Sequence, residues 1–83
     1  MRILYFAWLR DRAGLAEEEV APPAEVGTVA ELARWLSARS PGRAEALADL
    51  GLIRCAVDQD YARPEDPVRG AREVAFFPPV TGG

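Results

Sequence analysis

The end of this 83-residue chain holds the residues whose types could take part in covalent chemistry. It closes on Gly82 and Gly83, which lack side chains, so a terminal carboxylate could pass through a narrow channel and reach a reactive group. Residues 78–83 follow the last apolar run and can extend roughly 20 Å. The rigid pair Pro78 and Pro79 would direct them. We therefore expect a terminus that enters another protein's pocket; a frayed chain end is the alternative.

The remaining composition argues against catalysis by the chain's own side chains. There is no His, and all ten basic residues are Arg, which removes the usual general base and the commonest neutral metal ligand. Cys55 is the single cysteine, so neither an intrachain disulfide nor a thiolate metal cluster can form. We expect no bound metal or cofactor, and a reducing, cytoplasmic location.

Charge and hydrophobicity indicate one soluble domain without nucleic-acid or membrane partners. The net charge of -3 lacks the excess of Lys and Arg that the phosphate backbone rewards. The apolar N-terminal run is too short to span a bilayer. Hydrophobic residues make up 49% and charged residues 28%, a balance typical of folded domains. We expect a folded domain over residues 1–77 and a flexible tail over residues 78–83.

The N-terminal part of the chain predicts two strands. The continuous apolar run over residues 3–9 favours a strand with both faces apolar, followed by a polar turn over residues 10–14. Three glutamates open a short second segment, residues 17–21, which ends before Pro22 and Pro23. Proline and charge are tolerated at sheet edges, so this strand is expected there.

The middle of the chain predicts the main helix. Thr28 stands three residues before Glu31, which is the spacing of a capping box. Apolar residues then recur at helical intervals, at Val29, Leu32, Ala33 and Leu36. Residues 40–42 should end this helix, and a short second helix is expected over residues 43–50.

The C-terminal half predicts shorter strands. Ile53, Cys55 and Val57 alternate with more polar residues, which indicates a half-buried strand with Cys55 in the core; a redox or sulfur-relay role is the alternative for that thiol. Residues 58–60 could turn the chain into a hairpin, and residues 73–77 form a last strand. The order favours an α+β fold, with four to five strands around one main helix plus a short second helix.

This arrangement should leave an apolar surface uncovered. One main helix covers one face of a small sheet, whereas Phe76 and Phe77 must point to opposite faces. An exposed apolar patch typically marks a partner surface. Strand parity alone leaves open whether Phe6 and Phe77 pack in the core or face a partner.

Beyond these patterns, the sequence resembles the small subunits of molybdopterin synthase. Residues 76–83 (FFPPVTGG) closely resemble the end of that family, residues 5–11 with Gly14 resemble its opening, and residues 28–32 resemble its helix start. Residues 56–58 resemble its central strand, although Asp58 stands where the family often has Asn. The resemblance covers nearly the whole chain.

The resemblance implies a ubiquitin-like β-grasp fold and a carrier of sulfur for molybdenum cofactor synthesis. Gly83 would be adenylated by an activating enzyme that consumes ATP, converted to a thiocarboxylate, and used to sulfurate precursor Z, the cyclic pyranopterin monophosphate. The large synthase subunit would supply the catalytic groups, and two large subunits would lie at the centre of a heterotetramer. By position the resemblance assigns Phe6, Arg10, Tyr61 and Phe77 to the partner interface. The residues assigned to the tail are Pro78, Pro79, Val80, Thr81, Gly82 and Gly83.

Other functions remain open at this point. A related carrier for thiamine synthesis or transfer-RNA thiolation would share the fold and the terminal Gly-Gly. A ubiquitin-like modifier would instead join Gly83 to a lysine of a target protein. A non-covalent binding module with an inert tail is the fourth alternative.

Overall fold

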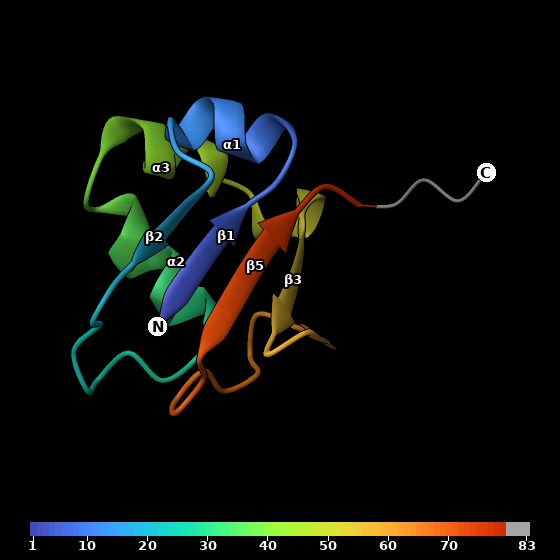
Figure 1. Cartoon of the computed structure of the whole chain (residues 1–83). Helices are drawn as coiled ribbons and strands as arrows, with labels where there is room; N and C mark the ends of the chain where they lie inside the picture. The colour runs from blue at the N-terminus through green and yellow to red at the C-terminus, as the bar shows by residue number, and fades with distance from the viewer. Residues whose placement is uncertain (80–83) are drawn as a thin grey trace.

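The first strand and the last strand lie side by side in the middle of a five-stranded sheet (Figure 1). They are β1 (Arg2–Tyr5) and β5 (Glu73–Phe77), and they run parallel. The other strands are β2 (Glu17–Glu19), β3 (Arg54–Val57) and β4 (Asp60–Ala62), each antiparallel to its neighbours. The order across the sheet is β2-β1-β5-β3-β4 in this computed structural model, which describes residues 1–79. The predicted edge position of β2 is confirmed.

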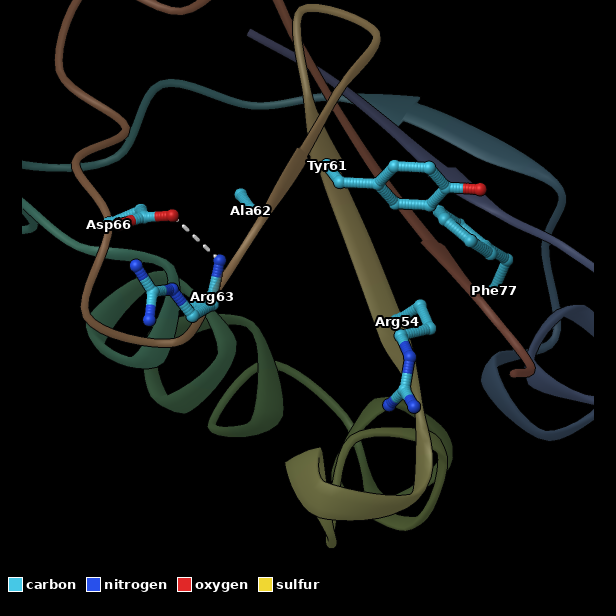
Figure 2. A pocket seen from close by; sticks show the side chains of 6 residues that line it. All are labelled: Arg54, Tyr61, Ala62, Arg63, Asp66 and Phe77. Carbon is cyan, nitrogen blue, oxygen red and sulfur yellow. Dashed lines mark hydrogen bonds between the residues drawn. The ribbon is translucent and has the colours of Figure 1, made fainter. Parts of the chain in front are cut away.

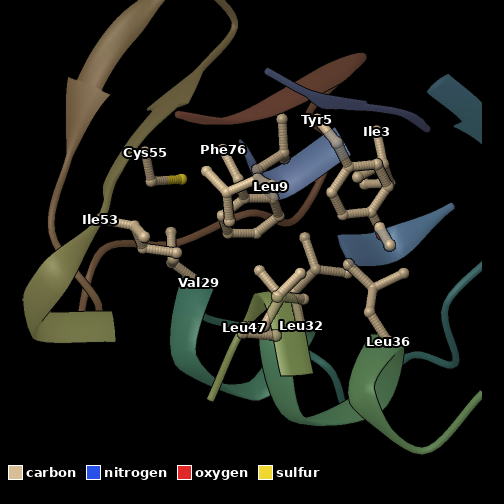
Figure 3. Packing of buried hydrophobic residues seen from close by; sticks show 14 of the residues in the cluster. Ile3, Tyr5, Leu9, Val29, Leu32, Leu36, Leu47, Ile53, Cys55 and Phe76 are labelled. Carbon is tan, nitrogen blue, oxygen red and sulfur yellow. The ribbon is translucent and has the colours of Figure 1, made fainter. Parts of the chain in front are cut away.

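Three α-helices pack with the sheet: α1 (Trp8–Ala13), α2 (Val29–Ser37) and α3 (Pro41–Ala46). A 3-10 turn, Leu50–Leu52, precedes β3. Figure 3 shows the core between the sheet and the helices, where Tyr5 and Phe76 from the strands meet Leu32 and Leu36 from α2. The two aromatic rings lie 6.2 Å apart, nearly stacked. The α+β class and the mixed sheet are therefore confirmed, and residues 1–79 contain three α-helices instead of the two expected.

The main helix begins where the sequence predicted. The hydroxyl of Thr28 accepts a hydrogen bond from the backbone N–H of Glu31 at 3.2 Å, and the Glu31 carboxylate accepts one from the Thr28 N–H at 3.0 Å. The Gly27 N–H also donates to this carboxylate, and these backbone bonds lower the pKa of Glu31. The capping box is thus present in full.

The strand expected over residues 3–9 is wrong beyond Tyr5, and the turn expected over residues 10–14 is mostly helix α1. A continuous apolar run does not distinguish a strand from a buried helix segment. Leu9 and Ala13, four residues apart, are buried and give α1 its inner side. The change of direction occurs at Ala7, whose φ of 54° is unusual for a residue with a side chain. Gly14, with φ of 85°, ends the helix.

The second short helix also begins earlier than predicted. Ser40 caps α3 by accepting a hydrogen bond from the Arg43 N–H at 3.1 Å, and Pro41 takes the first turn, where no N–H is needed. Helix α2 already ends at Ser37, with Ala38 as its C-cap, so residues 40–42, which were expected to end it, start α3 instead. A Cβ atom at Gly42 would lie 2.5 Å from the backbone oxygen of Arg12, so this glycine allows α3 to approach α1 closely.

A partly buried ion pair ties the edge strand β2 to α3. Two guanidinium nitrogens of Arg43 donate to the Glu18 carboxylate at 2.7 and 2.8 Å, and the Tyr5 hydroxyl donates to it at 2.8 Å. The hydrogen bonds from Arg43 lower the pKa of Glu18, whereas burial raises the pKa of Tyr5. We call these three residues the β2 clamp. It makes the acidic edge strand part of the packed structure.

Candidate functional site

The sheet face turned away from the core carries a continuous apolar band. The register pairs Leu4 of β1 with Ala75 of β5, Ala75 with Ala56 of β3, and Ala56 with Tyr61 of β4. Residues in register on neighbouring strands point to the same face, so the four side chains form a row. Phe6 and Phe77 adjoin this row at the end of β1 and β5. We define the open sheet face by these six side chains: Leu4, Phe6, Ala56, Tyr61, Ala75 and Phe77.

The aromatic residues predicted at a partner interface all lie on this face. Phe6 is 47% exposed and Tyr61 is 77% exposed, whereas Phe77 is half-buried. The rings of Tyr61 and Phe77 lie 5.9 Å apart and tilted by 53°, and Figure 2 shows them together. For Phe6 the core alternative is wrong, because Phe76 fills the core instead.

A hollow of about 470 Å³ follows the open sheet face toward the end of β5. The backbone N–H of Phe6 donates to the Phe76 oxygen at 3.1 Å, which holds the end of β1 against β5. Apolar side chains form most of the lining, and Gln59 and Glu73 complete it. Pro78, the first residue after β5, also lines this hollow. The start of the predicted tail therefore lies directly beside the open sheet face.

Arg10 is not brought into this hollow. It lies on α1, is exposed, and places its Nε atom 3.9 Å from a carboxylate oxygen of Asp11. It lines neither the hollow described above nor the second one described below. Its assignment to the interface stays a prediction.

The terminal residues that the sequence predicts to be reactive lie outside the described residues. Strand β5 ends at Phe77, Pro78 is half-buried and Pro79 is exposed. The remaining residues assigned to the tail lie beyond residue 79: Val80, Thr81, Gly82 and Gly83. Their roles, and the division of the chain at residue 77, stay predictions.

A second hollow, of about 520 Å³, lies at the β4 side of the open sheet face (Figure 2). Its walls include Tyr61 and Phe77. Arg54 of β3 also lines it, because Arg54 is in register with Phe77 on β5. The remaining lining residues are Ala62, Arg63 and Asp66. Sequence reasoning missed Arg54, because its place beside Phe77 depends on the β3–β5 register. The alternation over residues 53–57 did indicate that it points away from Cys55.

Cys55 belongs to the core, as predicted. It is buried, and burial, followed by the nearby negative charge of Asp66, raises the pKa of the thiol to about 12. The thiol is therefore protonated at neutral pH and is a weak nucleophile. This environment argues against the sulfur-relay alternative.

The open sheet face has the features of a docking surface. Within residues 1–79, no group of three or more His, Cys, Asp or Glu side chains is placed to hold a metal ion. The same stretch contains no helix long and apolar enough to cross a membrane. An apolar face bordered by aromatic rings can bury surface against another protein.

The chain is similar to known proteins over nearly its whole length. Residues 3–83 match the model of the ThiS family. The chain is 41% identical, over 83 residues, to the molybdopterin synthase sulfur carrier subunit of Escherichia coli strain K12, and the match covers 100% of this chain and 99% of that protein.

Two solved structures are similar in fold. SAMP1 from Haloferax volcanii is 25% identical with a TM-score of 0.78, and the match covers 100% of this chain and 98% of that one. A putative molybdopterin converting factor, subunit 1, from Pyrococcus furiosus is 24% identical with a TM-score of 0.68 and 95% coverage of both chains. The second likeness supports the fold alone.

Proposed function

The chain belongs to the ThiS family, and from that membership we propose that it is the sulfur carrier of a molybdopterin synthase. The observation that carries this proposal is the 41% identity to a sulfur carrier subunit along the whole of this chain, which itself ends in Gly82 and Gly83. The open sheet face beside the start of the tail supports it, because a carrier must dock before its terminus can react.

The reacting group in this proposal is the Gly83 carboxylate. A carboxylate resists attack by a sulfur nucleophile, whereas an acyl-adenylate has a good leaving group. The carboxylate attacks the α-phosphate of ATP and releases pyrophosphate. Sulfur at the oxidation level of sulfide then attacks the acyl carbon, a C–S bond forms, and AMP leaves as the C–O bond breaks. The product is a thiocarboxylate that can pass its sulfur to the pterin precursor.

The catalytic groups come from partner proteins. This chain has no His and no Lys, so it cannot supply the usual acid, base or ammonium groups around the acyl carbon. We propose that an activating enzyme binds ATP, that a separate system donates sulfur, and that a large synthase subunit binds the tail. Docking on the open sheet face would place residues 78–83 at the entrance of that subunit's pocket.

Intact-mass spectrometry tests the carrier chemistry. The chain is incubated with an activating enzyme of a molybdopterin synthase system, ATP and a sulfur donor, and a variant lacking Gly83 serves as control. We expect the mass gain of one oxygen-to-sulfur exchange in the intact chain alone, located at Gly83 by fragment mapping. Mapping is needed because oxidation of Met1 or Cys55 gives a nearly equal gain.

The outcomes separate the alternatives. Sulfur at Gly83, followed by sulfur transfer to the pterin precursor when a large subunit is added, supports the proposal. Sulfur at Gly83 without that transfer favours a carrier for another thiolation pathway. Adducts of higher mass on target lysines favour a protein modifier, and an unchanged carboxylate contradicts every carrier function.

A further inference from the structure

Arg54 is an uncompensated cation at the border of an apolar surface. It is exposed on β3, and within the described residues its guanidinium makes one hydrogen bond, 3.4 Å long, to the backbone oxygen of Ile53. No carboxylate within residues 1–79 forms an ion pair with it. On the open sheet face, Arg2 of β1 is by contrast paired with Glu73 of β5 at 3.2 Å.

The second hollow surrounds this cation with aromatic and charged groups. Tyr61 and Phe77 form its apolar side, and Figure 2 shows Arg54 below their rings and Arg63 beside Asp66. The Asp66 carboxylate accepts a hydrogen bond from the backbone N–H of Arg63 at 2.8 Å. The Arg63 guanidinium lies 3.6 Å from Glu65. Among the described lining residues, Arg54 and Asp66 therefore have no ion-pair partner, and the lining as a whole carries one more positive than negative charge.

We propose that this hollow binds a carboxylate side chain, Asp or Glu, of the large synthase subunit, next to an apolar side chain that packs on Tyr61 and Phe77. A guanidinium can form two parallel hydrogen bonds with a carboxylate. The apolar border excludes water, which strengthens such a pair. Because Arg54 is in register with Phe77, the pair would form one residue before the tail begins. This inference rests on the proposed function.

The charges favour a single carboxylate over a phosphate group. Asp66 lies in the lining, so it repels a doubly charged phosphate more strongly than a singly charged carboxylate, and a single negative charge matches the net charge of +1 on the lining side chains. The whole chain carries a net charge of -3, so a local positive site would also orient the chain toward an acidic spot on the large subunit. Arg54 would then determine specificity and orientation, and the apolar face would supply buried area.

Binding of the full-length chain to the purified large subunit, measured by calorimetry at low and high salt, tests this inference. The variants are Arg54→Gln and Arg54→Glu, with Arg34→Glu as matched control, because Arg34 is an exposed arginine on α2, across the sheet. We expect Arg54→Gln to weaken binding about tenfold and Arg54→Glu more, since the partner carboxylate loses its cation. The wild-type affinity should also fall more steeply with salt than that of Arg54→Gln.

Several outcomes would overturn the inference. Equal binding by wild type and Arg54→Glu would do so, as would an equal loss in Arg34→Glu, which would indicate a general charge effect. Saturable binding of inorganic phosphate to wild type but not to Arg54→Gln, with unchanged large-subunit affinity, would assign the hollow to a free anion. If wild type itself does not bind the large subunit, the proposed function fails and the inference with it. Thermal melting of each variant verifies folding.

Discussion

At the scale of single residues, Asp58 shows how one carboxylate can hold a turn and a strand together. It has a φ of 48° at the β3–β4 turn, and one of its oxygens accepts hydrogen bonds from the N–H groups of Arg72 and Glu73, at 2.9 and 3.0 Å. The position thus requires a short side chain with an acceptor oxygen that tolerates the left-handed region. Asp and Asn both satisfy this requirement.

We therefore predict that Asp58→Ala lowers the free energy of unfolding by about 2 kcal/mol, because it removes two hydrogen bonds and leaves a less tolerant residue at positive φ. Asp58→Asn should stay within about 0.5 kcal/mol of wild type, since it keeps one acceptor. Urea denaturation measures both. Equal losses in the two variants would contradict this account of the turn.

Ala7 leads to an opposite prediction, a stabilising substitution. Its φ of 54° and ψ of -131° cost free energy for any residue with a Cβ atom. Ala7→Gly should relieve this strain and raise the free energy of unfolding by about 1 kcal/mol, despite the greater freedom of glycine in the unfolded chain. Thermal melting should show a higher Tm. Ala48→Gly, at an exposed position without positive φ, is the control and should not raise it.

At the scale of elements, the β2 clamp makes the attachment of the edge strand depend on pH. Arg43 lowers the pKa of Glu18 in the folded chain below its ordinary value of 4.5. The contribution of the clamp to the free energy of unfolding is therefore complete above pH 4.5. It is lost as the pH falls through the lowered pKa that Glu18 has in the folded chain. Acid should release β2 from α3.

Glu18→Gln tests this dependence. At neutral pH we expect a loss of about 2 kcal/mol, because Arg43 is left partly buried without its carboxylate. Below a pH of about 4.5 the difference between variant and wild type should shrink, since wild-type Glu18 also loses its charge. Glu17→Gln, on the exposed side of the same strand, is the matched control. A constant difference at every pH would contradict the role of the charge.

At the scale of the whole molecule, some exposed apolar residues lie on the open sheet face and others lie elsewhere. Leu52 is 61% exposed but lies on the 3-10 turn, outside that face, whereas Tyr61 is 77% exposed within it. Exposure alone would make the two residues equivalent. The register of β4 on β3 makes them different.

We predict that Tyr61→Asp weakens binding to the large subunit by about 2 kcal/mol, since it removes an aromatic contact and buries a charge. Leu52→Asp should bind like wild type. Both substitutions introduce the same negative charge at an exposed site. A difference between their affinities in calorimetry therefore reports the position of the residue and not the added charge. Equal weakening would contradict docking on the open sheet face.

The sequence by itself determined the parts that depend on local chemistry. The Thr28 capping box, the strand over residues 73–77, the edge position of β2 and the burial of Cys55 all follow from short-range spacing or charge, and all are confirmed. The resemblance at residues 76–83 pointed to the family. These features can be predicted from the sequence because the patterns that indicate them lie within a few neighbouring residues.

Only the tertiary structure decided which residues share a face and where a continuous apolar run changes direction. Strand β1 ends at Tyr5, and the chain then forms helix α1, which buries Leu9 and Ala13. The apolar pattern over residues 3–9 could not show where the strand stops and the helix begins. Arg54 joins Phe77 through a register between segments far apart in sequence. Register is fixed by burial of the opposite face and not by local propensity, since a shift of one residue would reverse every side chain.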